Sequence, residues 1–426
     1  MKMKDSGVEW IGEIPEEWKV EKISQLFQQR NVKVSDFDYP PLSVTKNGIV
    51  PQLESAAKSD DHTNRKLVKK NDFVINSRSD RKMSSGVSNL DGSVSLINLV
   101  MSYNHEKLNS RFVNYMMKNY GFAEEFYRWG TGIVADLWST NWERGKNIQL
   151  PVPKVVEQQK IADFLDSKIA LIDQIIADTK HSIEELKAYK QSLITETVTK
   201  GLDPNVPMKD SGVEWIGKIP KEYGLTRIKY NYYLKGRIGW QGLTSADYVE
   251  EGPYLITGTD LIDGVVNWNS AVHISEENYE VAPDIHLKNN DLLISKDGTI
   301  GKVALVSSIG DKQASLNSGV LLVRNISNTT FNRYIFYVLQ SDIFWRWFES
   351  KKSPNSTILH LYQGDFKDFK YPVPNYNQQE KIAKYLDSKI SKVDELISEK
   401  NYVITENQSY KKSLIYEYVT GKKQVN

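Results

Sequence analysis

The feature that most constrains this chain is a long internal repeat. The ten residues 3–12, MKDSGVEWIG, return letter for letter at 208–217. The segments that follow the two copies, about 23–150 and 228–371, barely resemble each other. A period this long is typical of a duplicated domain and not of a solenoid, whose repeats are shorter. The sequence therefore predicts two similar frames that carry two different inserts.

A second repeated segment, PVP at 151–153 and 372–374, precedes a long helical pattern in each half. Apolar residues alternate there at steps of four and three for more than four heptads, which is the a and d seam of a coiled coil. We predict helices over about 157–199 and 378–420. Neither could hide its seam within a small domain, so each is expected to pair with the other. The apolar seam positions are Leu165, Ile172, Ile176, Ile183, Leu186 and Leu193, then Leu386, Val393, Ile397, Ile404 and Leu414.

Polar residues interrupt this seam at similar heights in both helices. They are Thr179 and Lys190 in the first helix, and Lys400, Asn407 and Lys411 in the second. Such residues favour one register at some cost in stability. The alternative is that the two helices are separate and that each packs on its own insert.

Each insert is predicted to be a compact α+β domain. Short β-rich runs are broken by Gly, Asn and Asp turns, and one amphipathic helix is expected per insert, at Ser110–Trp129 and Phe331–Glu349. The expected segments are 1–153 for the first box and insert, 154–205 for the central helix, 206–374 for the second box and insert, and 375–426 for the C-terminal helix.

Composition excludes several classes of protein. The chain has 426 residues, no Cys and a net charge of +1. The lack of Cys excludes disulfides, thiolate metal sites and a Cys nucleophile, and it fits a reducing cytosol. No apolar run reaches the ~18 residues that span a bilayer, and the N-terminus lacks the apolar core of a signal peptide. We expect a cytoplasmic protein without membrane contact.

Charge is distributed unevenly between the inserts. Residues 30–150 hold 17 Lys and Arg against 13 Asp and Glu, whereas residues 227–371 hold 15 against 16. A near-neutral total does not exclude nucleic acid, because phosphates respond to a local basic face. The dense basic stretch of the first insert comprises Lys58, Arg65, Lys66, Lys69, Lys70, Arg78, Arg81 and Lys82.

Motifs for catalysis are weak. The six histidines are scattered without the spacing of a metal site. The segment 298–302, GTIGK, lacks the four-residue gap and the Ser or Thr of a phosphate loop. Asp166-Ser-Lys168 and its copy Asp387-Ser-Lys389 have the Asp-x-Lys shape of half a nuclease motif, but they lie on the seam helices, where charged residues usually face solvent. We therefore expect no catalytic residue and no metal.

Candidates for recognition are stronger. A strand runs into a polar loop at the same place in both inserts, where 72–78, DFVINSR, aligns with 291–297, DLLISKD. Arg and Lys donate to guanine edges or phosphates, and Ser and Thr pair with either, so these loops suit DNA readout. The alternative is an ordinary solvated hairpin. The DNA-contact candidates are Ser77, Arg78, Ser79, Arg81 and Lys82 in the first loop, and Lys296, Thr299 and Lys302 in the second.

Several boxes together resemble the specificity subunit of type I restriction–modification systems. They run in the right order over essentially the whole chain, and their duplicated arrangement is specific. The boxes are GVEWIGxIP in both halves, Val44-Thr45-Lys46 before Gly48-Ile49, PVP before Gln158-Gln159-Lys160-Ile161-Ala162 and Leu165-Asp166, the run from Asp297 to Lys302, and the run from Gln363 to Phe366.

The resemblance implies two globular target recognition domains, each reading one half of a split sequence in double-stranded DNA. The fold class would be α+β, with these domains joined by two long antiparallel helices in a coiled coil and related by a pseudo-two-fold internal repeat. The helices would dock two methyltransferase subunits, and restriction or translocase subunits would complete the complex.

The resemblance also divides the chemistry between subunits. The partners would use S-adenosylmethionine, ATP and Mg²⁺, while this chain would be non-catalytic and bind no cofactor. Two alternatives stay open at this point. One is a protein-binding scaffold with a coiled-coil spacer, and the other is a self-sufficient nuclease or methyltransferase.

Overall fold

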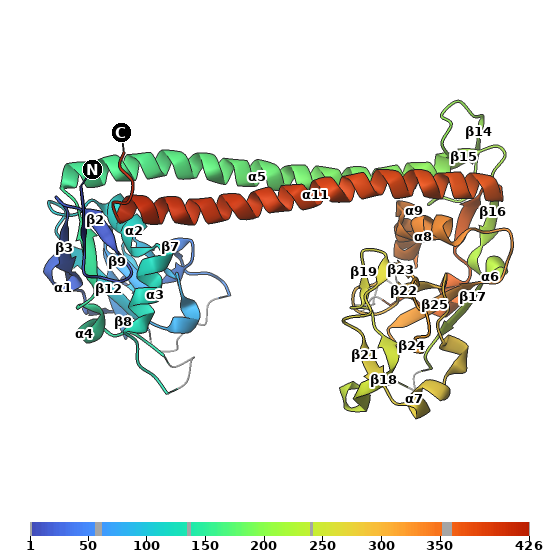
Figure 1. The fold of residues 1–426 in the computed structure, drawn as a ribbon, viewed down its shortest axis with the longest axis horizontal. Helices are drawn as coiled ribbons and strands as arrows, with labels where there is room; N and C mark the ends of the chain where they lie inside the picture. The colour runs from blue at the N-terminus through green and yellow to red at the C-terminus, as the bar shows by residue number, and fades with distance from the viewer. Residues whose placement is uncertain (1, 56–61, 134–137, 239–241, 352–359, 426) are drawn as a thin grey trace. The chain divides into compact units, whose positions relative to one another are not determined.

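The structure is a computed structural model that describes most of the chain (Figure 1). It divides into two compact units, the first made of 1–180 with 401–426 and the second of 181–400. Each unit therefore holds half of each long helix, and the segment boundaries predicted from the sequence stay a prediction. The described residues are 2–55, 62–133, 138–238, 242–351 and 360–425.

The two predicted long helices are confirmed as α5 (Val155–Lys200) and α11 (Tyr376–Val419). In the first unit, Lys411 Nζ lies 2.6 Å from the carboxylate of Asp173; in the second, Lys190 Nζ lies 2.6 Å from that of Asp394. On α5 the paired residue has number 173 in the first pair and 190 in the second, and on α11 it has number 411 in the first pair and 394 in the second. The residue number thus increases by seventeen along one helix while it decreases by seventeen along the other. Both units thus show the same antiparallel register.

Burial along the two helices follows the predicted apolar seam. Its members lie inside while residues between them, such as Asp178 and Glu399, are exposed. The polar seam residues Thr179 and Asn407 bond to carbonyl groups four residues earlier in their own helices, at 2.6 and 2.9 Å, which satisfies their polar atoms locally. Buried seam residues are Leu165, Ile172, Ile183, Leu386, Val393 and Leu414. Half-buried ones are Ile176, Leu186, Leu193, Ile397 and Ile404.

The single helix predicted at Ser110–Trp129 is wrong, because the structure has α2 (Ser110–Met117) and α3 (Tyr120–Arg128) there. Asn119 has an extended backbone, and its side chain accepts a hydrogen bond from the amide of Phe122. This is a helix N-cap, and the chain therefore starts a new helix at this point.

The second insert repeats the same break. The helix predicted at Phe331–Glu349 is wrong too, since α8 (Asn332–Gln340) and α9 (Asp342–Ser350) meet at Ser341. Ser341 is buried and extended, and its hydroxyl donates to the carbonyl of Val338 at 2.6 Å. The apolar periodicity runs through both breaks, so it could not reveal them.

In the first unit, strands form a four-stranded antiparallel sheet in the order β10-β9-β12-β4 and a three-stranded sheet in the order β11-β8-β5. The α2 and α3 helices share the main core with the first sheet. The strands are β10 (Ser85–Val87), β9 (Phe73–Asn76), β12 (Asn98–Tyr103), β4 (Phe27–Gln29), β11 (Gly92–Val94), β8 (Arg65–Val68) and β5 (Lys33–Val34).

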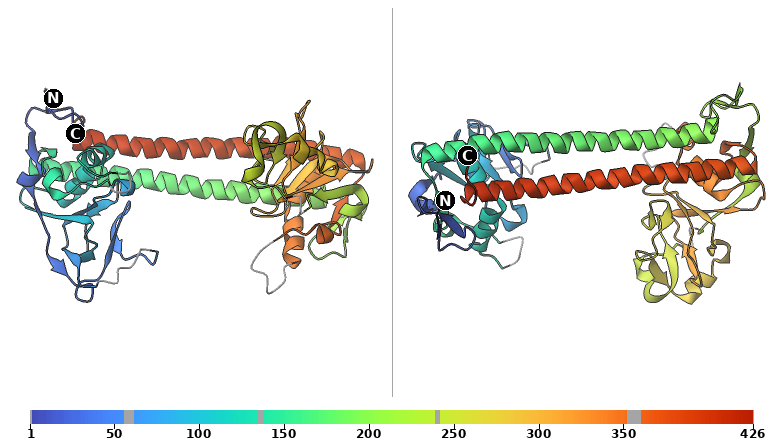
Figure 2. Two further views of the ribbon diagram at one scale, coloured as in Figure 1. Left: turned by 90° about the horizontal axis from the view of Figure 1, so that it is seen from below. Right: turned by 45° about the horizontal axis from the view of Figure 1, so that its top comes forward.

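The second unit contains the same four-strand core, in the order β23-β22-β25-β17, extended by β20 and β19. A second sheet has the order β21-β18-β24. The predicted α+β class is therefore confirmed in both units (Figure 2). The strands are β23 (Val303–Leu305), β22 (Leu292–Ser295), β25 (Val320–Asn325), β17 (Tyr232–Gly236), β20 (Val265–Val266), β19 (Leu261–Ile262), β21 (Val272–Ile274), β18 (Tyr248–Ile256) and β24 (Ala314–Leu316).

The repeated boxes form short hairpins at the helix ends. In the first unit Tyr416 of α11 donates to the carbonyl of Trp10 at 3.0 Å, and Lys422 donates to that of Ile11 at 2.8 Å. In the second unit Val213 and Ile216 share a core with the end of α5. Ribbons of two strands then close each insert. The elements are β1 (Met3–Asp5) with β2 (Glu13–Pro15), β14 (Met208–Asp210) with β15 (Lys218–Pro220), β3 (Lys19–Lys22) with β13 (Gln149–Val152), and β16 (Gly224–Arg227) with β26 (Lys370–Val373).

One buried glutamine clamps each insert to its own long helix. Gln158 accepts from the amide of Asn109 at 2.8 Å and donates to the carbonyls of Lys107 and Pro153 at 3.0 and 2.9 Å. Gln379 makes the same three bonds in the second unit, beginning with the amide of Phe331 at 2.8 Å. Both glutamines are fully buried, so each bond replaces one that water would make.

Removing this clamp should destabilise the protein. Gln158→Ala removes three hydrogen bonds to buried or part-buried backbone groups, so we expect a loss of about 2–4 kcal/mol in urea unfolding of the full chain. Gln379→Ala should cost a similar amount. The matched control is Gln174→Ala on the exposed surface of α5, which should change stability by less than about 0.5 kcal/mol. A loss below about 1 kcal/mol for both clamp variants would contradict the role of the clamp.

Candidate nucleic-acid interface

A buried carboxylate opens the strand before each candidate loop. Asp72 accepts from Arg30 Nε at 2.6 Å and from the amide of Lys69 at 2.8 Å. Asp291 is held in the same way by Arg324 Nε at 2.8 Å and by the amide three residues before it. The hydrogen bonds to these carboxylates raise the pKa of both arginines. The strand that leads into each loop therefore begins at a residue that hydrogen bonds hold in place.

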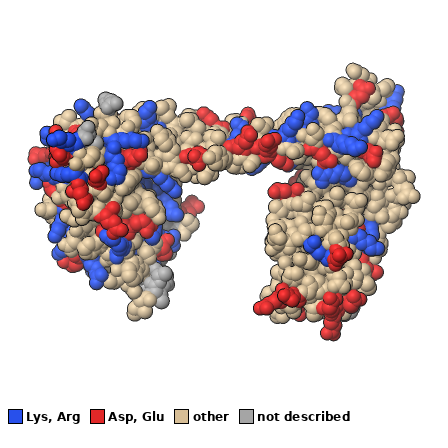
Figure 3. Space-filling model, viewed as in Figure 1, with Lys and Arg blue, Asp and Glu red and all other residues tan. Residues whose placement is uncertain are grey.

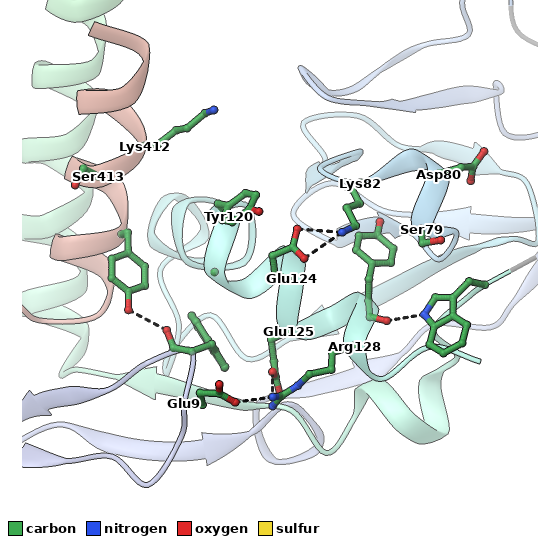
Figure 4. A pocket seen from close by; sticks show the side chains of 15 residues that line it. Glu9, Ser79, Asp80, Lys82, Tyr120, Glu124, Glu125, Arg128, Lys412 and Ser413 are labelled. Carbon is green, nitrogen blue, oxygen red and sulfur yellow. Dashed lines mark hydrogen bonds and ion pairs between the residues drawn. The ribbon is translucent and has the colours of Figure 1, made fainter. Parts of the chain in front are cut away.

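The first loop brings its basic side chains to the surface. Arg78 and Arg81 are exposed, and Ser79 to Arg81 form the short helix η1. Lys82 is also exposed but forms an ion pair with Glu124 of α3 at 3.0 Å (Figure 4). Ser77 is buried, so its hydroxyl lies away from any ligand that binds the loop surface.

An open pocket of about 1280 Å³ lies beside this loop, lined by η1, α3, the first box and the end of α11 (Figure 4). Arg128 of α3 pairs with Glu9 of the box at 2.7 Å and with Glu125 at 2.7 Å. Lys82 and Glu124 join the loop to the same helix. The loop is thus tied through α3 to the repeated frame.

The second loop is held by one buried hydroxyl. Ser295 Oγ donates to the carbonyl of Thr299 at 2.5 Å and accepts from the amide of Lys302 at 2.9 Å. Gly301 has a φ of +81°, which the tight return of the chain requires. Thr299 is exposed, Lys296 is half-buried, and Lys302 Nζ lies 3.4 Å from the carbonyl of Gly258. The eight predicted contacts therefore lie on two anchored loops, one in each unit, and their role in binding stays a prediction.

The basic stretch of the first insert is not one continuous surface. Arg65 and Lys66 are only 6% and 8% exposed, and they bond to Ser93 Oγ and the carbonyl of Asn98 at 2.8 Å each. Burial lowers the pKa of both groups. Lys69 pairs with an aspartate at 2.9 Å. Lys58 lies outside the described residues.

Two aspartates to which the sequence alone assigned no role, Asp166 and Asp387, connect the inserts to the long helices. Asp166 accepts from Tyr115 Oη at 2.6 Å and also pairs with Arg111 of α2. Asp387 accepts from Tyr337 Oη at 2.6 Å and from an arginine of α8 at 2.7 Å. These carboxylates do not simply face solvent but fasten the inserts to the helices. The exact repetition of Asp-Ser-Lys at 166–168 and 387–389 was the feature of the sequence that could have indicated this role.

The second unit carries an acidic end, visible where β18 and α7 (Glu276–Glu280) lie (Figure 3). Like charge repels phosphates, so this end is unsuited to contact with a DNA backbone. Lys296 directly follows β22, and Lys302 directly precedes β23. The exposed acidic residues are Glu250, Glu251, Glu276, Glu277 and Glu280.

No group of three or more His, Cys, Asp or Glu side chains among the described residues is arranged to hold a metal ion. Likewise, no helix in the described ranges is long and apolar enough to cross a membrane.

Comparison with known proteins shows what the chain is similar to. The model of the type I restriction modification DNA specificity domain matches residues 245–406. The putative type I restriction enzyme MjaX specificity subunit of Methanocaldococcus jannaschii is 21% identical over 439 residues, covering 97% of this chain and 96% of that protein. Over nearly its whole length the chain is therefore similar to a type I restriction enzyme specificity subunit.

Further relatives and solved structures give similar results. The EcoBI specificity subunit of Escherichia coli is 22% identical over 277 residues, covering 64% of this chain and 58% of that protein. A chain from a structure of a type I restriction–modification system, described for complex assembly and conformational transition, matches with a TM-score of 0.73 and 13% identity over 96% of this chain and 99% of that one. The HsdS subunit from Thermoanaerobacter tengcongensis gives a TM-score of 0.54 and 14% identity over 96% and 98%. These structures share the fold.

Proposed function

We propose that this specificity subunit gives a type I restriction–modification complex its choice of DNA sequence. Each unit would read one half of a split target in double-stranded DNA through its loop at the end of β9 or β22. The chain would be non-catalytic and bind no cofactor, while partner subunits would use S-adenosylmethionine, ATP and Mg²⁺. Similarity to type I restriction enzyme specificity subunits and the repeated architecture support this proposal.

One observation carries the proposal. The same four-strand core occurs in both units, with the same buried carboxylate before the loop and the same glutamine clamp to a long helix. The two loops that follow differ in sequence and conformation. A constant frame with different loops suits a protein that reads two different half-sites, because the frame fixes the position and the loop supplies the base contacts.

A face of the helix pair suits the docking of partner subunits. When the seam residues are assigned to heptad positions a and d, Asp166 and Asp387 fall at e positions. Both carboxylates accept hydrogen bonds from tyrosines of the inserts. The g positions flank the seam on the other side, and several carry exposed apolar residues, which mark interaction surfaces when they cluster. We call this row the g face. Its members are Ile175, Val403 and Tyr410 in the first unit and Tyr189 and Leu396 in the second.

The main competing function is a protein-binding scaffold with a coiled-coil spacer. Salt dependence separates the two. A DNA reader assembled with its partners should lose affinity steeply as salt rises, because bound phosphates release counterions. A protein interface built on apolar surface should change less.

Exchange of one insert tests the proposal directly. Replacing 23–150 by the corresponding insert of another family member should change one half of the methylated DNA motif and leave the other half intact. The measurement is methylome sequencing of cells that express the chain with its methyltransferase subunit. The purified chain alone, given DNA, Mg²⁺ and S-adenosylmethionine, should leave the DNA unmodified. A change in both halves of the motif would reject separate readers.

Substitutions in the loops test the predicted contacts. Arg78→Ala and Lys302→Ala should each weaken binding by about 1–3 kcal/mol if the side chain contacts a base, with loss of preference at one position of the target. Uniform weakening on all sequences would indicate a phosphate contact instead. The measurement is fluorescence anisotropy of the assembled complex on matched and mismatched duplexes at one salt concentration. Lys187→Ala, on the exposed side of α5, is the control. Unchanged affinity for both loop variants would remove these residues from the interface.

A further inference from the structure

The internal repeat allows the g face of one unit to be compared with that of the other, residue by residue. Positions 221 apart are equivalent. Ile175 and Leu396 are equivalent and are 46% and 45% exposed; Tyr410 and Tyr189 are equivalent and are both 53% exposed. The Asp173–Lys411 and Lys190–Asp394 pairs place each aliphatic residue nearly level with its tyrosine. Two similar docking faces are therefore present.

The two faces differ beside this shared pair. One turn before Ile175, Leu171 is 58% exposed. Its equivalent in the second unit is Lys392, which is also exposed. An apolar side chain gains from burial at an interface, whereas a lysine there loses hydration and needs a partner. The face of the first unit therefore offers more apolar surface to a partner.

A second difference lies at the end of the helix pair. In the first unit Ser413, one turn after Tyr410, lines the open pocket of about 1280 Å³ together with Lys412, Tyr416 and the exposed Tyr120 (Figure 4). The Nε1 atom of Trp10, another lining residue, is buried and has no hydrogen-bond partner among the described residues.

The equivalent contacts in the second unit are already made within the chain. Gln191, equivalent to Lys412, donates to the carbonyl of Gln340 and to the carboxylate of Asp342, at 2.8 Å each. Thr195, equivalent to Tyr416, accepts from the amide of Asp342 at 2.9 Å. Hydrogen bonds thus join the end of α5 directly to the start of α9. At the equivalent place in the first unit, Lys412 and Tyr416 line the open pocket instead.

We propose that the two docking faces are unequal, and that a methyltransferase subunit binds first and more tightly to the face of the first unit. This face comprises Leu171, Ile175, Tyr410 and the adjoining pocket. The inference rests on the proposed function, because it takes the methyltransferase subunit as the occupant. Assembly would then pass through a defined complex with one partner before the second partner binds.

Titration of the full chain with its methyltransferase subunit, followed by native mass spectrometry, tests this order. Two dissociation constants that differ at least tenfold are expected, with the complex of one partner accumulating first. Hydrogen exchange at equimolar ratio should show protection at 168–175 and 410–416, and not at 189–196 and 389–396. Equal dissociation constants, or protection of the second unit first, would overturn the proposal.

Exchange of the differing residue sharpens the test. Leu171→Lys should weaken the tight step at least fivefold, and Lys392→Leu should strengthen the weak step by a similar factor. The control is Ala177→Lys, which adds the same charge at an exposed position on the other side of α5 from Ile175 and should leave both steps within twofold. If neither exchange alters its step, the inequality does not come from these residues and the proposal fails. If no partner binds the wild-type chain at any ratio, the docking role in the proposed function fails as well.

Discussion

The antiparallel pairing of α5 and α11 is the constraint on which the rest of the structure depends. Each helix carries a seam of Leu, Ile and Val that would be exposed if the helix stood alone. Pairing removes that surface from water, which is favourable in proportion to the apolar area buried. Lys190 and Lys411 lie in the seam yet reach Asp394 and Asp173, so the stems cover apolar surface while the charges stay near water.

The inserts are attached to the long helices by contacts that are repeated in both halves. A fully buried glutamine and a half-exposed aspartate on each helix receive hydrogen bonds from the insert of the same half. Both groups sit at equivalent places in the two copies. The loops at the strand ends lie beyond these clamps, so their sequences can vary without changing how the insert is held. This separation of frame from loop is what a subunit that chooses DNA sequences requires.

The internal symmetry is not perfect, and its exceptions are informative. Gln191 and Thr195 bond to α9, whereas their equivalents Lys412 and Tyr416 leave a pocket beside α3. The first unit also has Leu171, and the second its equivalent Lys392, one turn before the g-face residues Ile175 and Leu396. Duplicated halves can diverge in this way because only the contacts that hold the frame have to be kept in both.

The sequence by itself determined the duplication, the two long helices, their seam and the α+β class, because periodic burial of apolar residues is a local property that can be read from spacing. Only the tertiary structure decided where the helices of the inserts break, since Asn119 and Ser341 act through their backbone conformation and caps. It also decided that Arg65 and Lys66 are buried and that Asp166 and Asp387 hold the inserts. Such roles depend on partners 28 or more residues away in the chain, and no spacing within a helix or strand encodes them.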